Sequence, residues 1–225
     1  MSGSWLTLEA ESAFTPRWGQ HVTRLRLGAD GKLESLTPDY DAAATDALKS
    51  YLSLDTSTAD AEAMLPRRSD AHLDMAMRAF PGLRILRQPF GETLLGFLCS
   101  ATKQIVQIKQ MLALLAEHHG SPLPTTCHLI DDKPVRALPT WTQLAELSEE
   151  QLRGCQLGFR ARYIKGTADF LAAHPGWLEQ TATLPYADAK AALCILPGVG
   201  EKIADCVALF GLGHLAAFPV DTWMI

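Results

Sequence analysis

Apolar and polar residues alternate in the first part of the chain, and the remainder repeats its apolar residues at helical spacing. In residues 4–38, Val22, Leu25 and Leu27 stand among polar neighbours, which is typical of a half-buried strand. The sequence Ala-Asp-Gly-Lys at residues 29–32 provides a turn after them. We therefore expect a β-hairpin that belongs to a small antiparallel sheet.

The remainder of the chain has the pattern of a helical protein. The apolar stripe from Ile105 to Leu115 predicts a long amphipathic helix that ends near Gly120. Ser148 and Gln151 have the spacing of a capping box and predict the start of another helix. Residues 121–139 contain four prolines and are expected to form a loop. Further helical segments are expected at residues 44–52, 58–65, 70–80, 94–98, 140–147, 148–154, 160–173, 187–195 and 201–210.

These patterns predict an α+β fold with two domains. Residues 1–85 are expected to form an N-terminal α/β module with an antiparallel sheet, and residues 86–225 a mostly α-helical domain. The chain stops at Ile225, four residues after Asp221. If Asp221 caps a helix, that helix has barely begun. We therefore expect a helical domain truncated at its C-terminus, either because the chain is a fragment or because the protein lacks its closing helices.

Composition sets broad limits on location and partners. The chain has no apolar run near the roughly 18 residues of a membrane-spanning helix, and its N-terminus lacks the pattern of a secretory signal. We therefore expect no membrane partner and an intracellular location, in a nucleus or in the bacterial cytoplasm or nucleoid. The formal net charge of −5 argues mildly against nonspecific binding to polyanions. It does not exclude DNA binding, because backbone amides can hold phosphates.

The cysteines and histidines are scattered along the sequence. The five cysteines form no CxxC pair and have no histidine at the spacing of a metal site, so we expect reduced thiols that pack mostly in the core. They are Cys99, Cys127, Cys155, Cys194 and Cys206. None of the seven histidines is expected to be catalytic.

The sequence LPGVGEKIADC, at residues 196–206, is the strongest candidate for function. A Gly-rich turn between two helices, here Pro197-Gly198-Val199-Gly200, can present backbone N–H groups to an anion such as a phosphate. The alternative is a plain helix–helix turn, because Gly and Pro commonly end helices. The adjoining lysine and the predicted flanking helices favour the phosphate-binding interpretation.

Lys202 and Asp221 are the candidate chemical groups. Lys202 is expected on the second residue of the helix after the turn, where the helix dipole disfavours its ammonium form. A neutral amine there could attack C1′ of a damaged nucleoside, form a Schiff base and nick the strand by β-elimination. The carboxylate of Asp221, in the sequence PVD, could stabilise positive charge on the sugar. The alternatives are a solvated surface lysine and an aspartate that only caps a helix.

With these residues in view, the chain resembles the helix-hairpin-helix DNA glycosylase superfamily, and specifically its 8-oxoguanine DNA glycosylase branch. The resemblance extends from LPGVGEKIADC and FPVDTWM to residues 84–104, 157–164 and 190–200, and covers nearly the whole chain. It implies a bifunctional DNA glycosylase/AP lyase of base excision repair that removes an oxidised purine from duplex DNA. No cofactor is expected to be required, and the protein is expected to be a monomer.

The resemblance also implies roles for individual residues. Lys202 would be the Schiff-base nucleophile and Asp221 the essential carboxylate. Gly198 and Gly200 would bind a DNA phosphate through their amides, and Cys206 would line the base pocket. The remaining implied roles are a duplex wedge for Phe159, reading of the orphaned base for Arg160, DNA contacts for Thr102, Lys103 and Gln107, and a hairpin cation held by the carbonyls of Cys194, Leu196 and Val199.

The chain departs from the family pattern at several of these positions. Residues 102–104, Thr-Lys-Gln, replace an asparagine cluster, and Gln107 replaces a second arginine that reads the orphaned cytosine. Trp223 replaces a phosphate-binding histidine, and residues 14–18 only loosely match the motif that distinguishes oxidised guanine. Further pocket residues would lie past Ile225. We therefore expect lyase chemistry with weaker or different selectivity for the opposite base.

Three alternatives to this function remain open on the sequence. A monofunctional glycosylase for alkylated purines would share the fold and use water in place of the lysine. An iron–sulfur endonuclease of the same superfamily is disfavoured because it lacks the N-terminal sheet module. A noncatalytic module that binds damaged DNA would keep the hairpin without turnover.

Overall fold

The structure is a computed structural model. It describes residues 4–8, 11–15, 17–18, 21–30, 32–35, 42–55, 57–123 and 135–221. Contacts between residues divide the chain into two compact units, one of residues 40–87 and one of residues 1–39 with 88–225. The domain boundary predicted after residue 85 stays a prediction.

The N-terminal strands form two antiparallel sheets. Four strands, β1 (Ser4–Leu8), β2 (Glu11–Thr15), β5 (Leu25–Leu27) and β6 (Leu33–Ser35), pair in that order, and β3 (Arg17–Trp18) pairs with β4 (His21–Val22). The β5–β6 register places Leu25 opposite Ser35 and Leu27 opposite Leu33. The expected antiparallel hairpin around residues 29–32 is therefore confirmed.

In the part that the structure describes, the unit of residues 40–87 contains three helices, α1 (Ala42–Tyr51), α2 (Thr58–Met64) and α3 (Ala71–Ala79). Asp70 caps α3, because its carboxylate accepts from the first-turn amides of His72 and Leu73 at 3.0 Å. Within the same unit, Asp74 pairs with Arg67 and Arg78, each at 2.8 Å. The three helices confirm the segments expected between residues 44 and 80.

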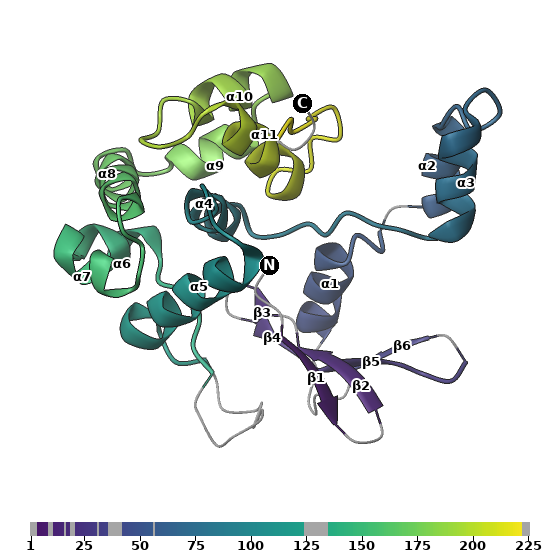
Figure 1. Cartoon of the computed structure of the whole chain (residues 1–225), viewed down its shortest axis with the longest axis horizontal. Coiled ribbons are helices and arrows are strands. Elements are labelled where there is room, and N and C mark those ends of the chain that lie inside the picture. The colour runs from purple at the N-terminus through teal and green to yellow at the C-terminus, as the bar shows by residue number, and fades with distance from the viewer. Residues whose placement is uncertain are drawn as a thin grey trace. The chain divides into compact units, whose positions relative to one another are not determined.

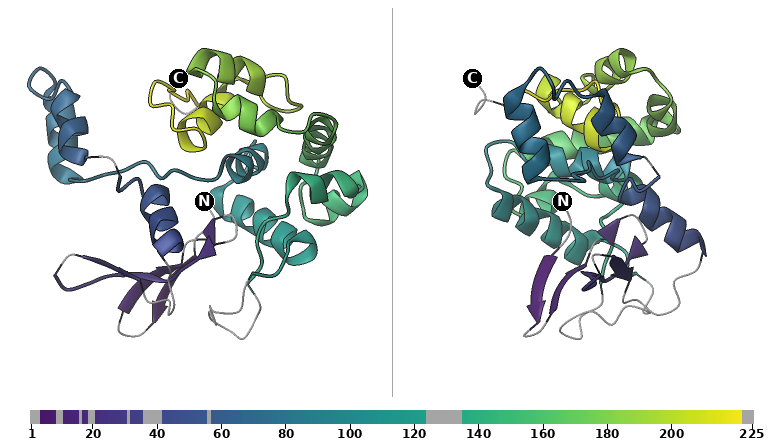
Figure 2. Two further views of the ribbon diagram at one scale, coloured as in Figure 1. Left: turned by 180° about the vertical axis from the view of Figure 1, so that it is seen from behind. Right: turned by 90° about the vertical axis from the view of Figure 1, so that its right-hand side faces the viewer.

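Eight helices follow among the described residues of the other unit, and Figures 1 and 2 show their arrangement. They are α4 (Phe90–Leu98), α5 (Ile105–His119), α6 (Trp141–Glu146), α7 (Glu149–Gly154), α8 (Arg160–Ala173), α9 (Trp177–Ala182), α10 (Tyr186–Leu193) and α11 (Glu201–Phe210). The capping box predicted at Ser148 and Gln151 begins α7. Helix α9 was missed by the sequence analysis, because it is short and follows Gly176, which has a φ of +81°. The mostly helical fold with a small antiparallel component is confirmed.

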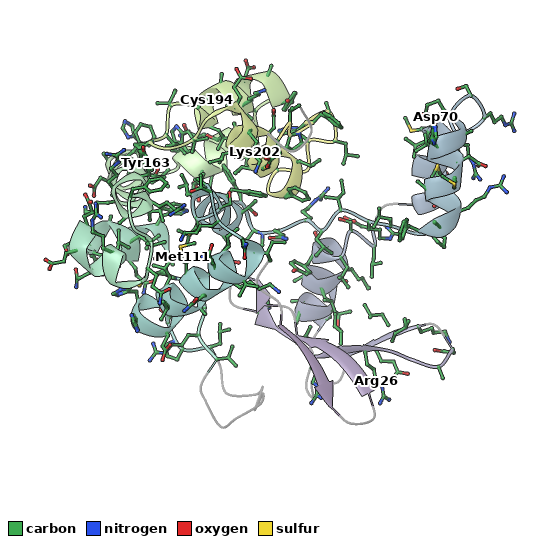
Figure 3. The ribbon with its side chains drawn as sticks, viewed as in Figure 1. Arg26, Asp70, Met111, Tyr163, Cys194 and Lys202 are labelled. Atoms are coloured by element: carbon green, nitrogen blue, oxygen red, sulfur yellow. The ribbon has the colours of Figure 1, made fainter. Side chains whose placement is uncertain are left out.

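The core of these helices is a continuous apolar cluster. The side chains of Leu94, Leu115, Ile164 and Val207 are fully buried in it and come from α4, α5, α8 and α11. Met111, labelled in Figure 3, is 2% exposed and joins the same cluster from α5. This packing fixes the relative positions of the helices that carry the candidate site, since densely packed interiors resist displacement.

Two further findings concern the expected loop and membrane contact. Only the ends of residues 121–139 are described, where Pro122 and Arg136 form an antiparallel bridge. None of the described helices combines the length and apolar character needed to cross a bilayer.

Candidate active site

A tight turn between α10 and α11 forms the candidate anion site. Gly198 has a φ of +80°, which residues other than glycine rarely adopt. A Cβ atom on Gly198 would lie 2.7 Å from Cγ of Tyr163, a residue of α8 that is labelled in Figure 3. Glycine is therefore required at position 198 both by backbone conformation and by close approach to Tyr163.

Helix α8 supports the turn at two more points. A Cβ atom on Gly166 would lie 3.1 Å from the ring of Pro197, and the hydroxyl of Thr167 donates to the Pro197 carbonyl at 3.3 Å. Pro197 is therefore packed closely against α8. Sequence reasoning missed Tyr163 and Thr167 as supports, because their contact with the turn depends on how two distant helices pack.

The turn leaves room and donors for an anion. A Cβ atom on Gly200 would have no heavy atom within 4 Å. The N–H groups of Gly198 and Gly200 have no acceptor among the described residues. Because Gly200 is the N-cap of α11, the partial positive charge of that helix start adds to these amides. The geometry is suited to a phosphate.

Lys202 and Asp221 form an ion pair beside this turn. Lys202 is the second residue of α11, as predicted, and its Nζ lies 3.0 Å from Oδ2 of Asp221. The two side chains are 38% and 40% exposed, so a substrate can reach them. The ring centroid of Phe97, on α4, lies 6.0 Å from the Lys202 Nζ. An amine and a carboxylate, 19 residues apart in the sequence, thus meet at an open position next to the anion-binding turn.

Cys206 lies one helical turn after Lys202 on α11. It is 4% exposed, and burial raises the pKa of its thiol, although the charge of Lys202 acts in the opposite direction. A high pKa keeps the sulfur neutral and makes it a poor nucleophile. Its position beside Lys202 is compatible with the expected role in lining a pocket, which stays a prediction.

A cavity of about 310 Å³ opens between α4, α5 and α11. Phe97 lines this cavity, and its ring centroid lies 6.0 Å from the Lys202 Nζ, but neither Lys202 nor Asp221 is among the lining residues. Most of its wall is apolar, with Glu92 and Lys109 as its ionisable groups. Its volume is in the range of small-molecule pockets.

A second lysine near the turn has a structural partner. Lys190, on α10, lies 3.0 Å from Oδ2 of Asp205 and 3.3 Å from Oε2 of Glu201. The Tyr186 hydroxyl donates to Oδ1 of Asp205 at 2.5 Å. The Asp205 carboxylate raises the pKa of Lys190 above its ordinary value, so this amine stays charged. The network joins α10 to α11, and its members gave no signal in the sequence.

Phe159 and Arg160 lie at the start of α8. The ring of Phe159 is 45% exposed, and the Arg160 guanidinium carbon lies 4.3 Å from the ring centroid. Arg160 is 3% exposed and donates to the carbonyls of Ala101 and, at 3.2 Å, Leu157. It also donates to the Thr102 hydroxyl at 3.0 Å. The structure thus brings Thr102 to Arg160, with the guanidinium bonded to protein rather than presented to solvent.

The remaining expected DNA-contacting residues lie near the start of α5. The Gln107 side chain accepts from the backbone N–H of Gln104 at 3.2 Å and so caps that helix. Lys103 is partly exposed in the same segment. The side chains of residues 14–18 and the position of Trp223 lie outside the described residues. The DNA contacts expected of Lys103 and Gln107 stay predictions.

The carbonyl groups of the turn can accept a cation. The Leu196 carbonyl oxygen accepts a hydrogen bond from the Val199 N–H at 3.1 Å. Its second lone pair is left to bind a cation. The carbonyls of Cys194 and Val199 receive no hydrogen bond from the described residues. Neutral oxygen donors of this kind suit a hard cation. Cys194, labelled in Figure 3, lies at the end of α10.

Curated relatives with similar sequences are N-glycosylase/DNA lyases. The chain is 36% identical over 188 residues to "N-glycosylase/DNA lyase OGG1" of Arabidopsis thaliana, a match that covers 80% of this chain and 49% of that protein. It is 35% identical over 151 residues to "N-glycosylase/DNA lyase" of Saccharomyces cerevisiae, covering 62% of this chain and 39% of the relative. The chain therefore spans about half or less of the length of these relatives. No protein-family model matches the chain.

Solved structures with similar folds include a bacterial glycosylase. The 8-oxoguanine glycosylase/lyase of Clostridium acetobutylicum in its apo-form matches with a TM-score of 0.83 and 28% identity, over 97% of this chain and 73% of that chain. A 3-methyladenine DNA-glycosylase from Archaeoglobus fulgidus matches with a TM-score of 0.69 and 17% identity, over 98% of this chain and 71% of that chain, and shares the fold alone.

Proposed function

Because the chain belongs to the 8-oxoguanine DNA glycosylase branch of the helix-hairpin-helix superfamily, we propose that it is a bifunctional DNA glycosylase/AP lyase. Its substrate would be an oxidised purine, of the 8-oxoguanine class, in double-stranded DNA. The observation that carries the proposal is the 3.0 Å contact between Lys202 Nζ and Asp221 Oδ2 beside an open, amide-lined turn.

The chemistry begins at Lys202. After its proton has been removed, the amine forms a bond to C1′ of the extruded nucleotide while the bond from C1′ to the purine breaks. The purine leaves with a proton, and opening of the sugar ring gives an imine between Nζ and C1′. Loss of a proton from C2′ then breaks the C3′–O bond and nicks the strand. Water hydrolyses the imine and restores the amine.

Asp221 and the turn prepare this step. The Asp221 carboxylate stabilises positive charge on the sugar as the base departs, and it can receive the proton of the neighbouring amine. The N–H groups of Gly198 and Gly200, which have no acceptor in the part of the chain that the structure describes, hold a phosphate of the same strand, which fixes the sugar relative to Lys202. The carbonyls of Cys194, Leu196 and Val199 would hold a cation, whose charge would offset that of the phosphate. No redox or organic cofactor takes part.

Recognition of the duplex falls to the start of α8 and the segment before α5. The exposed ring of Phe159 wedges into the stack at the flipped base. Arg160 reaches the orphaned base only after it leaves its bonds to Ala101 and Thr102. With Thr102 and Gln107 in place of stronger hydrogen-bonding readers, we infer weak discrimination between opposite bases. We infer further that the protein acts as a monomer on DNA inside the cell.

The test is covalent trapping. A duplex with a single 8-oxoguanine opposite cytosine is incubated with the protein and borohydride, which reduces the imine to a stable adduct. We expect a protein–DNA adduct with the native chain and none with Lys202→Ala. Lys165→Ala is the matched control, because Lys165 lies on α8, where its Nζ pairs with Asp169 and donates to the Ala145 carbonyl at the end of α6.

The outcomes separate the candidate functions. Base release without an adduct indicates a monofunctional glycosylase, and duplexes with alkylated purines test that alternative. Binding to abasic DNA with neither release nor nicking indicates a noncatalytic module. An adduct that persists in Lys202→Ala assigns the nucleophile to another amine and refutes the mechanism.

A further inference from the structure

A cluster of potential metal ligands lies away from the proposed catalytic pair. His118 and His119 are the last two residues of α5, and Cys155 directly follows α7. One ligand atom from each of the three side chains lies within 4.8 Å of the others. The sequence gave no sign of this cluster, because His118 and Cys155 are 37 residues apart.

The distances are close to those of a coordinated ion. Sγ of Cys155 lies 3.9 Å from Nδ1 of His118. In a tetrahedral zinc site with bonds of about 2.0–2.3 Å, ligand atoms are roughly 3.3–3.7 Å apart. Small rotations would bring the three atoms to that spacing, and the exposed ring of His118 is free to make them.

The three side chains of the cluster differ in their exposure. His119 is half-buried beside His118, its neighbour at the end of α5. Cys155 is fully buried, whereas His118 is exposed, so an ion would be enclosed on one side and open to water on the other.

We propose that His118, His119 and Cys155 form a zinc-binding site, with a water molecule as the fourth ligand. One thiolate and two imidazoles are ligands that zinc favours, whereas magnesium and calcium prefer oxygen. The proposal does not depend on whether the chain acts on DNA.

The site would join α5 to the turn that leads into α8. Cys155 precedes Phe159 by four residues, and that turn contains two residues with left-handed backbone, Gln156 at a φ of +62° and Gly158 at +57°. A metal that holds Cys155 would therefore restrict the turn carrying Phe159. The expected role is structural, because the ligands lie on elements other than α11 and the Lys202 segment.

The test uses cobalt(II) as a spectroscopic probe on the full chain after removal of bound metals. We expect one cobalt per chain, with the visible bands of tetrahedral coordination and a thiolate-to-metal charge-transfer band, both lost when zinc is added. His118→Gln and His119→Gln should weaken cobalt affinity by at least about tenfold. Cys155→Ser should abolish the charge-transfer band.

A matched control makes the result specific. His174→Gln removes an exposed histidine at the end of α8 and should keep the full spectrum. Because Cys155 is buried, circular dichroism must show that Cys155→Ser is folded, and the exposed His118→Gln provides the decisive variant if it is not. A native chain without a charge-transfer band, or a full spectrum that survives His118→Gln, overturns the proposal.

Discussion

Substitution of Gly198 by alanine should damage the fold, whereas the same change at Gly200 should not. At Gly198 a side chain must adopt a φ of +80°, which costs roughly 1–2 kcal/mol for an L-residue. The new Cβ would also lie 2.7 Å from Cγ and 2.8 Å from Cβ of Tyr163. The Cβ atom of Tyr163 is fixed by the α8 backbone and cannot rotate away, so overpacking adds about 1–3 kcal/mol.

The expected loss for Gly198→Ala is therefore about 2–5 kcal/mol in the free energy of unfolding. For a chain of this size, such a loss lowers the melting temperature by on the order of 10 °C. At Gly200 the φ is −94° and a Cβ meets nothing within 4 Å, so Gly200→Ala should cost at most about 1 kcal/mol, the disadvantage of alanine at an N-cap.

The assay is thermal or urea unfolding of the two variants beside the native chain, followed by DNA binding at fixed salt. Gly200→Ala should stay folded and bind DNA more weakly, because its methyl group occupies the space through which a phosphate approaches the amides. Equal stability losses in the two variants would refute the steric argument. Unchanged DNA affinity in folded Gly200→Ala would refute the role of the turn as a phosphate site.

Two further predictions follow from individual contacts. Hydrogen bonds from Arg67, and then from Arg78, lower the pKa of Asp74 below its ordinary value of 3.8. This carboxylate therefore stabilises the α2–α3 region above pH 3.8, and the stabilisation is lost as the pH falls through the pKa of the folded state. The stability difference between the native chain and Asp74→Asn, measured by urea unfolding, should therefore shrink as the pH falls below 3.8; a constant difference would contradict the ion pairs. Thr102 is β-branched and has a φ of +52°, so Thr102→Asn should raise the free energy of unfolding by about 1 kcal/mol, measured by thermal melting. The same change should strengthen selectivity for the opposite base, measured by cleavage of duplexes with each opposite base. A loss of stability would mean that the hydroxyl bond to Arg160 outweighs the backbone strain.

The elements with strong local signals were predicted well from the sequence. The apolar stripe from Ile105 to Leu115 defined α5, and the capping box at Ser148 defined the start of α7, because both depend on residues within a few positions of one another. The turn at Gly198 and the position of Lys202 on α11 were likewise local. The meeting of Lys202 with Asp221 was expected from a family resemblance and from chemistry rather than from spacing.

The features that sequence reasoning missed depend on tertiary contacts or on weak local patterns. Helix α9 has six residues and a glycine N-cap, so neither its length nor its cap distinguished it from a loop. The closeness of Tyr163 to Gly198 follows from the packing of α8 on the turn. Cys155 and His118 meet only because α5 and α7 end at the same place. The burial of Arg160 was also unexpected, since arginine is usually exposed.

The ion pair between Lys190 and Asp205 has a consequence for the fidelity of the proposed reaction. A reactive sugar aldehyde can be captured by any uncharged primary amine nearby, and α10 places a second lysine close to α11. Because the carboxylates of Asp205 and Glu201 keep Lys190 protonated, its amine does not react with such an aldehyde. A chain that has lost Lys202 should therefore have no substitute nucleophile at Lys190. Neutralising Asp205 is the change that would create one.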